Sequence, residues 1–358
     1  MLDFAKEAIE SAKENGINFE DLRAGRATIK VIGVGGMGCN AITWLQNKSI
    51  QGAKTYVANT DALHLGICKA DQKILLGKEL TKGLGCGGYP KRGREAAKES
   101  LAEIKRAVSE SDMVFVVAGM GGGTGTGAAP VVAQTAKESG ALVIGVVTMP
   151  FETERARMDK AEFGLQELRE VCDTVIVADN TRLVEIAGDL PIEQAFAVSN
   201  ELISTMIKGI TETITIPSLV NLDYADVSAI MKGGGVAVIG IGQSDTQNRV
   251  EEAVHQALTH PLLDVDYKGA TGALIHITCG SDMKLEELNR VTGIVTSQLA
   301  QDAQVIFGAR LEKSFTGKVR VITIITGVKS PYVLGKDQLP SSSSPQTEMS
   351  ELGIEIFR

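Results

Sequence analysis

The sequence predicts an α/β protein in which a Rossmann-like, parallel-sheet domain is joined by a long central helix to a smaller α/β domain. Short β-branched runs alternate with amphipathic stretches as far as about Ala178, an order typical of right-handed βαβ crossovers. A long helical pattern follows, and a second set of alternating strands and helices comes after it. At 358 residues the chain also exceeds the usual size of a single core, about 250–300 residues.

The elements can be placed one by one from hydrophobic periodicity. In the first domain, strands are expected at residues 28–34, 53–59, 72–76, 113–118, 141–148 and 173–179, with helices between them. Pro191 opens the central helix, which continues to about Thr213, because proline is well tolerated in the first helical turn. In the second domain, strands are expected at 235–242, 273–279, 303–308 and 318–326, and helices at 246–258 and 285–299.

The two terminal segments differ from the rest of the chain. Leu2–Glu14 has the spacing of an amphipathic helix, and its mixed-sign polar face favours a docked or mobile appendage over a membrane helix. The serine-rich stretch 341–345 predicts a disordered linker, because it has too little apolar content to pack. The chain then ends in an apolar tip, Leu352–Arg358, which is either a frayed terminus or, as we favour, a short linear motif.

These patterns predict five parts. They are an N-terminal helical extension (1–24), the first domain (25–190), the central helix with its following loop (191–222), the second domain (223–329) and the linker with its tail motif (330–358).

Composition excludes several classes of protein. Hydrophobic residues make up 44% of the chain, but no run approaches the roughly 18 apolar residues of a transmembrane helix, so no membrane span is expected. The start, Met1–Glu7, is charged and lacks the apolar core of a signal peptide. A net charge of −8 argues against broad nucleic-acid binding.

The cysteines indicate a reducing compartment, the cytoplasm. Five are present, scattered along the chain without a C-x-x-C pair: Cys39, Cys68, Cys86, Cys172 and Cys279. Neither a zinc site nor a disulfide framework is therefore expected from their spacing, and no metal ligands are predicted.

A glycine-rich stretch at residues 119–127 carries the strongest functional signal. It lies between the apolar run Met113–Ala118 and the predicted helix Ala128–Ser139. A flexible turn would need only one or two glycines, whereas glycines that lead from a strand into a helix bring backbone N–H groups and the helix dipole to one anion. The predicted phosphate ligands here are Gly121, Gly122, Gly123, Thr124, Gly125, Thr126 and Gly127.

A second glycine cluster follows the predicted strand Ile29–Val34 and precedes a helix at Ala41–Lys48. Its candidate ligands are Gly35, Gly36, Met37, Gly38, Cys39 and Asn40. Gly33, Gly35 and Gly38 fit G-x-G-x-x-G, but a dehydrogenase would place an acid at the end of the next strand, and Asp61 lies too far along. No G-x-x-x-x-G-K-[ST] motif is present. Two glycine loops on one sheet indicate a single polyphosphate held from two sides.

With these motifs the chain resembles the FtsZ/tubulin family, and within it the archaeal type of FtsZ. The resemblance runs from about Thr28 to about Lys329 and is carried, in order, by 33–40 (GVGGMGCN), 59–61 (NTD), 80–85 (LTKGLG), 121–127 (GGGTGTG) and 221–226 (NLDYAD). It implies the tubulin/FtsZ architecture and a GTPase that binds GTP with Mg²⁺. It further implies a head-to-tail homopolymer that acts in cell division at the division site, and a membrane-anchoring adaptor bound by Leu352–Arg358.

The resemblance also implies contacts to the base and the ribose. Asn180 and Asn200 match positions that contact guanine, with Asn200 in place of the aspartate usual in FtsZ and like the asparagine of tubulins. Glu154 and Arg157 match the ribose ligands, although the segment is one residue short; Asp61 belongs to the family's nucleotide loop. The alternative for Asn200 is a polar residue within a helix, and for Glu154 and Arg157 a solvated helix start.

No general base is evident around the glycine loops. In the family, water-activating carboxylates come from the next subunit in an N-x-D-x-x-D loop, and this chain has Asn221, Asp223 and Asp226. The alternative is N-terminal capping of the helix expected at Asp226–Met231, which would explain one aspartate but not both together with Asn221. Two other functions remain open: a Rossmann-type NAD-dependent oxidoreductase and a tubulin-like filament without a role in division.

Overall fold

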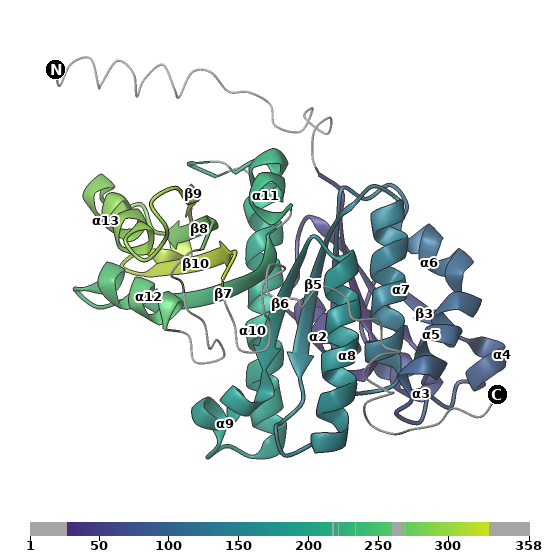
Figure 1. Ribbon diagram of the computed structural model, residues 1–358. Coiled ribbons are helices and arrows are strands. Elements are labelled where there is room, and N and C mark those ends of the chain that lie inside the picture. The colour runs from purple at the N-terminus through teal and green to yellow at the C-terminus, as the bar shows by residue number, and fades with distance from the viewer. Residues whose placement is uncertain are drawn as a thin grey trace, which may run out of the picture.

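The computed structural model describes residues 27–216, 218–220, 222–232, 234–259, 267 and 270–328. The predicted helix Leu2–Glu14 and the predicted linker and tail motif lie outside these residues. The described strands form one sheet of ten, in the order β3-β2-β1-β4-β5-β6-β7-β10-β8-β9 (Figure 1). Within the described residues, no helix is long and apolar enough to cross a membrane.

The first six strands pair in parallel, as predicted. They are β1 (Ile29–Val34), β2 (Ala53–Asn59), β3 (Gln72–Leu75), β4 (Met113–Gly119), β5 (Leu142–Met149) and β6 (Thr174–Asp179). The helices between them are α2 (Gly35–Asn47), α3 (Ala62–Ile67), α4 (Lys78–Thr81), α5 (Pro90–Glu99), α6 (Leu101–Val108), α7 (Thr124–Glu138) and α8 (Arg155–Val171). Because parallel strands need crossovers, this order brings all their carboxyl ends to one edge.

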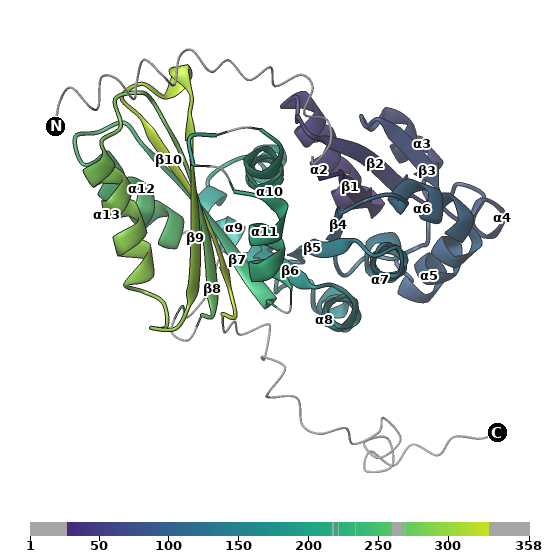
Figure 2. The same cartoon turned by 90° about the horizontal axis from the view of Figure 1, so that it is seen from above.

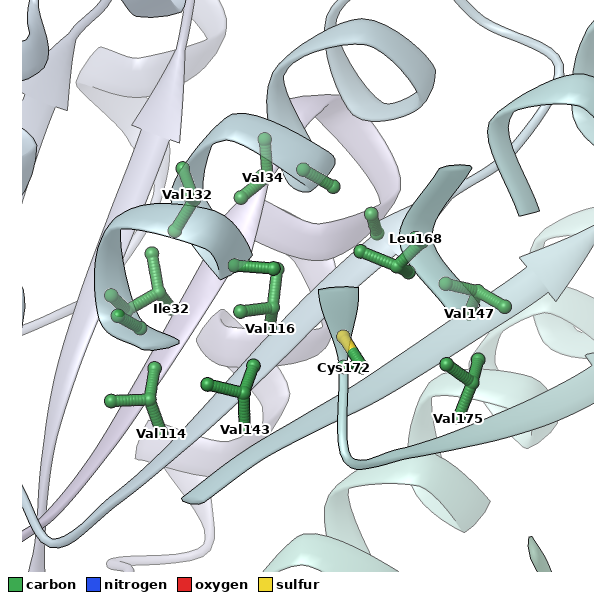
Figure 3. Packing of buried hydrophobic residues seen from close by; sticks show 14 of the residues in the cluster. Ile32, Val34, Val114, Val116, Val132, Val143, Val147, Leu168, Cys172 and Val175 are labelled. Atoms are coloured by element: carbon green, nitrogen blue, oxygen red, sulfur yellow. The ribbon is translucent and has the colours of Figure 1, made fainter. Parts of the chain in front are cut away.

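Both faces of this parallel half are buried. Along β1, Ile32 and Val34 contact the cluster under α5 to α8, whereas Ile29 and Val31 contact the cluster under α2 and α10. Figure 3 shows the first cluster, with Val132 of α7 packed over β1 and β4. Side chains alternate between the faces with period two, so burial on both sides requires a continuous apolar run. Each fully buried Val or Ile contributes about 1.5–3 kcal/mol to folding.

The second half of the sheet is mixed. β7 (Gly235–Ser244) and β8 (Gly272–Cys279) each pair antiparallel with β10 (Val319–Thr326), and β9 (Gln304–Leu311) pairs parallel with β8. On one face of these strands lie α12 (Arg249–Leu258) and α13 (Leu285–Thr296), which share a core with β8 and β10. A short 3₁₀ turn, Lys313–Phe315, precedes β10.

The two halves meet in two ways. After α9 (Asn180–Ala187), the central helix α10 (Ile192–Thr215) packs against α2 on one side and β8 on the other (Figures 1 and 2). β7 also pairs in parallel with β6, in the register Thr174↔Gly235, which makes the sheet continuous. The sequence patterns did not predict this junction. α11 (Tyr224–Met231) follows α10.

Three helix starts differ from prediction. α2 begins at Gly35 rather than Ala41, α7 at Thr124 rather than Ala128, and α11 at Tyr224 rather than Asp226. Glycine has low helix propensity, so a propensity argument places the helix start after the glycines. In the structure, glycines of both loops form the first helical turns.

Candidate functional site

A cavity of about 490 Å³ opens at the carboxyl ends of β1, β4, β5 and β6. Its volume lies within the range of small-molecule sites, about 300–1,000 Å³. Of the predicted ligands, it is lined by Gly36, Met37, Asn40, Gly122, Gly123, Thr124, Gly125, Glu154, Arg157, Asn180 and Asn200. The tertiary structure therefore brings together residues from both glycine loops, from α8 and from α10.

Two helix N-termini face this cavity, those of α2 and α7. The first N–H groups of a helix have no partner within it, and the residues before these helices, Val34 and Gly123, make no side-chain cap. At Gly36 and Gly122 the space that a Cβ would occupy is open. The cradle can thus offer backbone N–H groups and two helix dipoles to an anionic ligand, which fits a polyphosphate.

Other glycines of the loops hold the cradle together instead of lining it. An ideal Cβ would lie 2.2 Å from the Val117 carbonyl oxygen at Gly38 and 1.9 Å from the Pro90 carbonyl oxygen at Gly127. At Gly35, where φ is +73°, a Cβ would meet the Gly125 nitrogen at 2.7 Å, so this glycine joins the two loops. Gly121 has φ +86°, a value that L side chains rarely adopt.

The two threonines of the second loop behave differently. Thr124 lines the cavity, and its hydroxyl is hydrogen-bonded to that of Thr60 at 2.7 Å. Thr126 does not line it: its side chain is 1% exposed and its methyl group packs in the space left by Gly164. Asp61 also lies outside the cavity lining, and its carboxylate caps α3 by accepting from the His64 N–H at 3.0 Å.

Glu154 and Arg157 both line the cavity although their segment is one residue short. They form an ion pair at 2.5 Å, and the other Glu154 oxygen accepts from the Phe151 N–H at 3.1 Å. Phe151 in turn makes an edge contact with Phe196 of α10, with ring centroids 6.0 Å apart. These bonds fix the rim next to Asn200.

Sequence reasoning missed several cavity residues: Gly119, Met120, Thr148, Pro150, Phe151, Phe196 and Ser199. Phe196 could have been found, because it lies four residues before the candidate Asn200 on α10 and residues three or four apart share a helix face. Ser199 in turn lies three residues after Phe196. Thr148 and Pro150 follow from the position of the cavity at the end of β5, which only the sheet order reveals.

Asp223 and Asp226 lie at the opposite edge of the sheet. The Tyr224 hydroxyl donates to the carbonyl of Asp112, the residue before β4, at 2.8 Å. The glycine loop starts at the other end of β4, a strand of 7 residues. A strand of that length spans about 20 Å, so these carboxylates cannot reach their own cavity. Asn221 falls outside the described residues.

Asp223 and Asp226 both take part in capping the start of α11. The Asp223 carboxylate accepts from the Asp226 N–H at 2.8 Å, and the Asp226 carboxylate accepts from the Asp223 N–H at 3.2 Å. This is a reciprocal capping box, so capping does engage both aspartates, contrary to the expectation that it would explain only one. Each bond uses one carboxylate oxygen and leaves the second oxygen of each residue for another partner.

Cys39 does not line the cavity but belongs to a cluster that the sequence did not predict. The ligand atoms of Cys39, His64 and Cys68 lie within 4.8 Å of one another. The neighbouring Cys39 thiol lowers the pKa of Cys68 to about 6, and Cys68 together with burial raises the pKa of Cys39. His64 and Cys68 are four residues apart, which was the available sequence signal, whereas Cys39 joins them only through the packing of α2 on β2 and α3.

Fold and cavity define a nucleotide-binding α/β protein with a phosphate cradle made of two glycine-rich helix starts. Residues 28–188 match the GTPase domain of the tubulin/FtsZ family, and residues 235–329 match the C-terminal domain of the FtsZ family. The chain therefore belongs to the tubulin/FtsZ family of GTPases, in its FtsZ branch.

Individual relatives agree with this. Cell division protein FtsZ 2 of Methanocaldococcus jannaschii is 52% identical over 330 residues, which cover 91% of this chain and 87% of that protein. Cell division protein FtsZ 1 of Thermococcus kodakarensis is 54% identical over 314 residues, 87% of this chain and 84% of that protein. A solved structure of an empty FtsZ dimer from M. jannaschii has a TM-score of 0.83 at 48% identity and covers 94% of this chain and 98% of that chain.

The oxidoreductase alternative is not supported. The family matches lead to GTPases. Gly33 and Gly38 serve close packing, since an ideal Cβ on Gly33 would lie 2.3 Å from the Gly38 carbonyl oxygen. No acidic residue at the end of β2 lines the described cavity.

Proposed function

We propose that this protein is a cell-division GTPase whose subunits stack head to tail, with GTP bound in the cradle of one subunit and hydrolysed with help from Asp223 and Asp226 of the next. The proposal rests on where the nucleotide cavity and the two aspartates lie within one subunit. The cavity lies at the carboxyl edge of the parallel strands, and the aspartates lie at the amino edge.

The cavity residues fit GTP. The N-termini of α2 and α7 suit the phosphates, and Glu154 and Arg157 suit the ribose hydroxyls. The amides of Asn180 and Asn200 can each offer one acceptor oxygen to the N–H groups of guanine. Mg²⁺ would be held mainly by phosphate oxygens and water, as is usual for this ion, and would neutralise phosphate charge.

The described cavity lacks a free carboxylate. Glu154 is its only acidic lining residue, and it is paired with Arg157. A neighbouring subunit that docks its amino edge on this cavity would bring in Asp223 and Asp226, each with one oxygen not used by the capping box. Such carboxylates can orient water and accept a proton, which is worth about 10²–10⁴-fold in rate.

Head-to-tail stacking joins two different surfaces of the subunit. Such a heterologous contact does not close on itself unless the rotation forms a ring, so repetition gives a filament. The similar M. jannaschii structure is described as an FtsZ dimer, which supports self-association.

A complementation experiment tests the shared site. Asp226→Asn keeps an oxygen that accepts from the Asp223 N–H, so the helix cap is preserved while the negative charge is removed. The GTP affinity of this variant should stay within tenfold of the wild type, and its GTP turnover should fall about 10²–10⁴-fold. Gly122→Leu should block the cradle and leave the aspartates intact. Mixing the two variants should restore turnover, because about one interface in four of a random copolymer joins a working cradle to a working loop.

Co-sedimentation of labelled Gly122→Leu subunits with Asp226→Asn filaments is the control for mixed assembly. If the two variants sediment together and turnover stays at the level of the single variants, hydrolysis takes place within one subunit and the proposal is wrong.

We further propose that the tail, Leu352–Arg358, binds a membrane-anchoring adaptor and brings the cytoplasmic filament to the division site. The support is its apolar character after a serine-rich spacer. Truncation after Lys329 should leave GTP turnover and polymerisation intact and abolish recruitment to the division site in cells. A truncated protein that still localises there would overturn the role of the tail.

A further inference from the structure

We propose that Cys39, His64 and Cys68 bind one Zn²⁺ ion per chain, at a site next to the nucleotide cavity and joined to it through Asn40. The three side chains come from two elements: Cys39 from the first turns of α2, and His64 and Cys68 from α3 and its end. Nothing in the proposed GTP chemistry uses them. Two thiols and an imidazole are the donors that Zn²⁺ prefers in proteins.

The spacing of the donor atoms is close to that of a bound ion. The Cys68 sulfur lies 3.7 Å from Nδ1 of His64, and all three donor atoms lie within 4.8 Å of one another. With Zn–S near 2.3 Å and Zn–N near 2.0–2.1 Å, tetrahedral geometry places sulfur and nitrogen about 3.6 Å apart and two sulfurs about 3.8 Å apart. Small side-chain rotations would therefore suffice.

The histidine is oriented for such a role. Its Nε2 lies 3.1 Å from Oδ1 of Asn40; this oxygen can only accept, so Nε2 carries the proton and Nδ1 keeps its lone pair toward the cysteines. Ligating histidines in metal sites are held in this way by an oxygen on the other nitrogen. The Asn59 amide donates to Nδ1 at 3.2 Å, and this bond is the one that the ion would replace.

The two thiols make few hydrogen bonds that an ion would displace. The Cys68 thiol donates to the His64 carbonyl oxygen at 3.1 Å, a bond that it would give up as a thiolate on the ion. Cys39 is 0% exposed, and its contacts to the carbonyl oxygens of Gly33 and Ala58 are long, 3.7 and 3.8 Å. Cys68 lines a shallow surface depression beside Lys69 and Asp71, which gives an ion a path from solvent. Among the described residues no fourth histidine, cysteine or carboxylate joins the group. Water would thus complete the tetrahedron, as in open zinc sites.

The site adjoins the nucleotide cavity. Asn40 accepts from His64 and also lines the cavity, so its amide would be shared by the two sites. Cys39 precedes it directly in the first glycine loop.

Co²⁺ is a suitable probe for a test on the full chain, reduced and freed of metal with a chelator. One Co²⁺ per chain should bind with the intense d–d bands of a tetrahedral site and a thiolate-to-cobalt charge-transfer band, and Zn²⁺ should abolish both. Cys68→Ser and His64→Ala should each weaken binding by more than about tenfold, the lower bound for losing even an outer partner of such a site. Cys279→Ser, which changes a buried cysteine outside the cluster, should bind as the wild type does.

Thermal unfolding provides a second readout that does not depend on absorption. Zn²⁺ should raise the Tm of the wild type and of Cys279→Ser, because an ion that binds only the folded state stabilises it, and it should leave Cys68→Ser unchanged. The proposal is overturned if the wild type shows no thiolate-to-cobalt band, if the band persists in Cys68→Ser, or if Cys39 and Cys68 form a disulfide that reductant does not open.

Discussion

The Tyr224 hydroxyl donates a hydrogen bond of 2.8 Å to the backbone carbonyl of Asp112, and this bond ties the first residue of α11 to the amino end of β4. The same strand leads at its other end into the glycine cradle. One strand therefore sets the separation between the cradle and the carboxylates of Asp223 and Asp226. Their placement on opposite edges of one subunit makes a shared site between subunits geometrically natural.

Removing that bond should affect hydrolysis more than binding. Tyr224→Phe should lower the free energy of unfolding by about 1 kcal/mol, the usual contribution of such a bond. It should also reduce GTP turnover at saturating GTP, since the capping box loses its anchor, without changing GTP affinity. Denaturant unfolding and phosphate release measure the two effects.

Tyr267→Phe is a matched control, because that hydroxyl also donates to a backbone carbonyl, that of Leu258 at 2.6 Å, and Tyr267 neither lines the cavity nor bonds to Asp223 or Asp226. It should lose similar stability and keep its turnover. Equal turnover in the two variants would show that Tyr224 does not position the carboxylates.

A side chain at Gly122 should block the nucleotide without harming the fold. Its Cβ direction is open and the residue lines the cavity, so the leucine of Gly122→Leu would fill the cradle rather than clash with the protein. GTP binding, measured by calorimetry, should be lost while Tm changes little. The control is Gly293→Leu on α13, where the space for a side chain is also open; this variant should bind GTP normally. If the Gly122→Leu protein still binds GTP, the assignment of the cavity as the GTP site is wrong.

Gly127→Ala should destabilise the protein. Alanine normally favours a helix over glycine by up to about 1 kcal/mol, but here the Cβ would lie 1.9 Å from the Pro90 carbonyl oxygen. Overpacking of this kind costs about 1–3 kcal/mol and outweighs the propensity gain. Urea unfolding should show a net loss, whereas Gly293→Ala, in an open helical position, should show a gain. A stabilised Gly127→Ala would mean that α5 and α7 can move apart freely.

Buried His276 should make stability depend on pH. Burial, and then Arg310 and Arg320, lower its pKa from 6.5 to about 4, and its side chain is 4% exposed. The unfolded chain therefore binds the proton more readily, so stability falls as the pH drops from 6.5 toward 4. Between pH 7 and pH 5 this group alone should remove about 2 kcal/mol.

The matched variant for this effect is His276→Asn, which cannot titrate. Its urea-unfolding free energy should fall less than that of the wild type over the same pH interval. Parallel curves for the two proteins would show that His276 does not contribute to the pH dependence.

The sequence by itself determined what depends on near neighbours in the chain. Strand positions followed from apolar periodicity, and the cradle followed from glycines at two strand-to-helix junctions. The family matches confirmed the predicted GTPase activity. The N-x-D-x-x-D motif is recognisable from six consecutive residues. Such features need only a few consecutive residues, because hydrogen bonds and φ/ψ preferences act locally.

The tertiary structure decided the properties that depend on which distant residue packs against a given position. Gly36 and Gly122 line the cavity, whereas Gly38 and Gly127 pack directly against the carbonyl group of another segment. The flanking sequence does not distinguish these two pairs of glycines. The Cys39–His64–Cys68 cluster likewise arises only where α2 and α3 meet over β2. These properties are fixed by distances between segments remote in the chain, which close packing sets and local pattern does not encode.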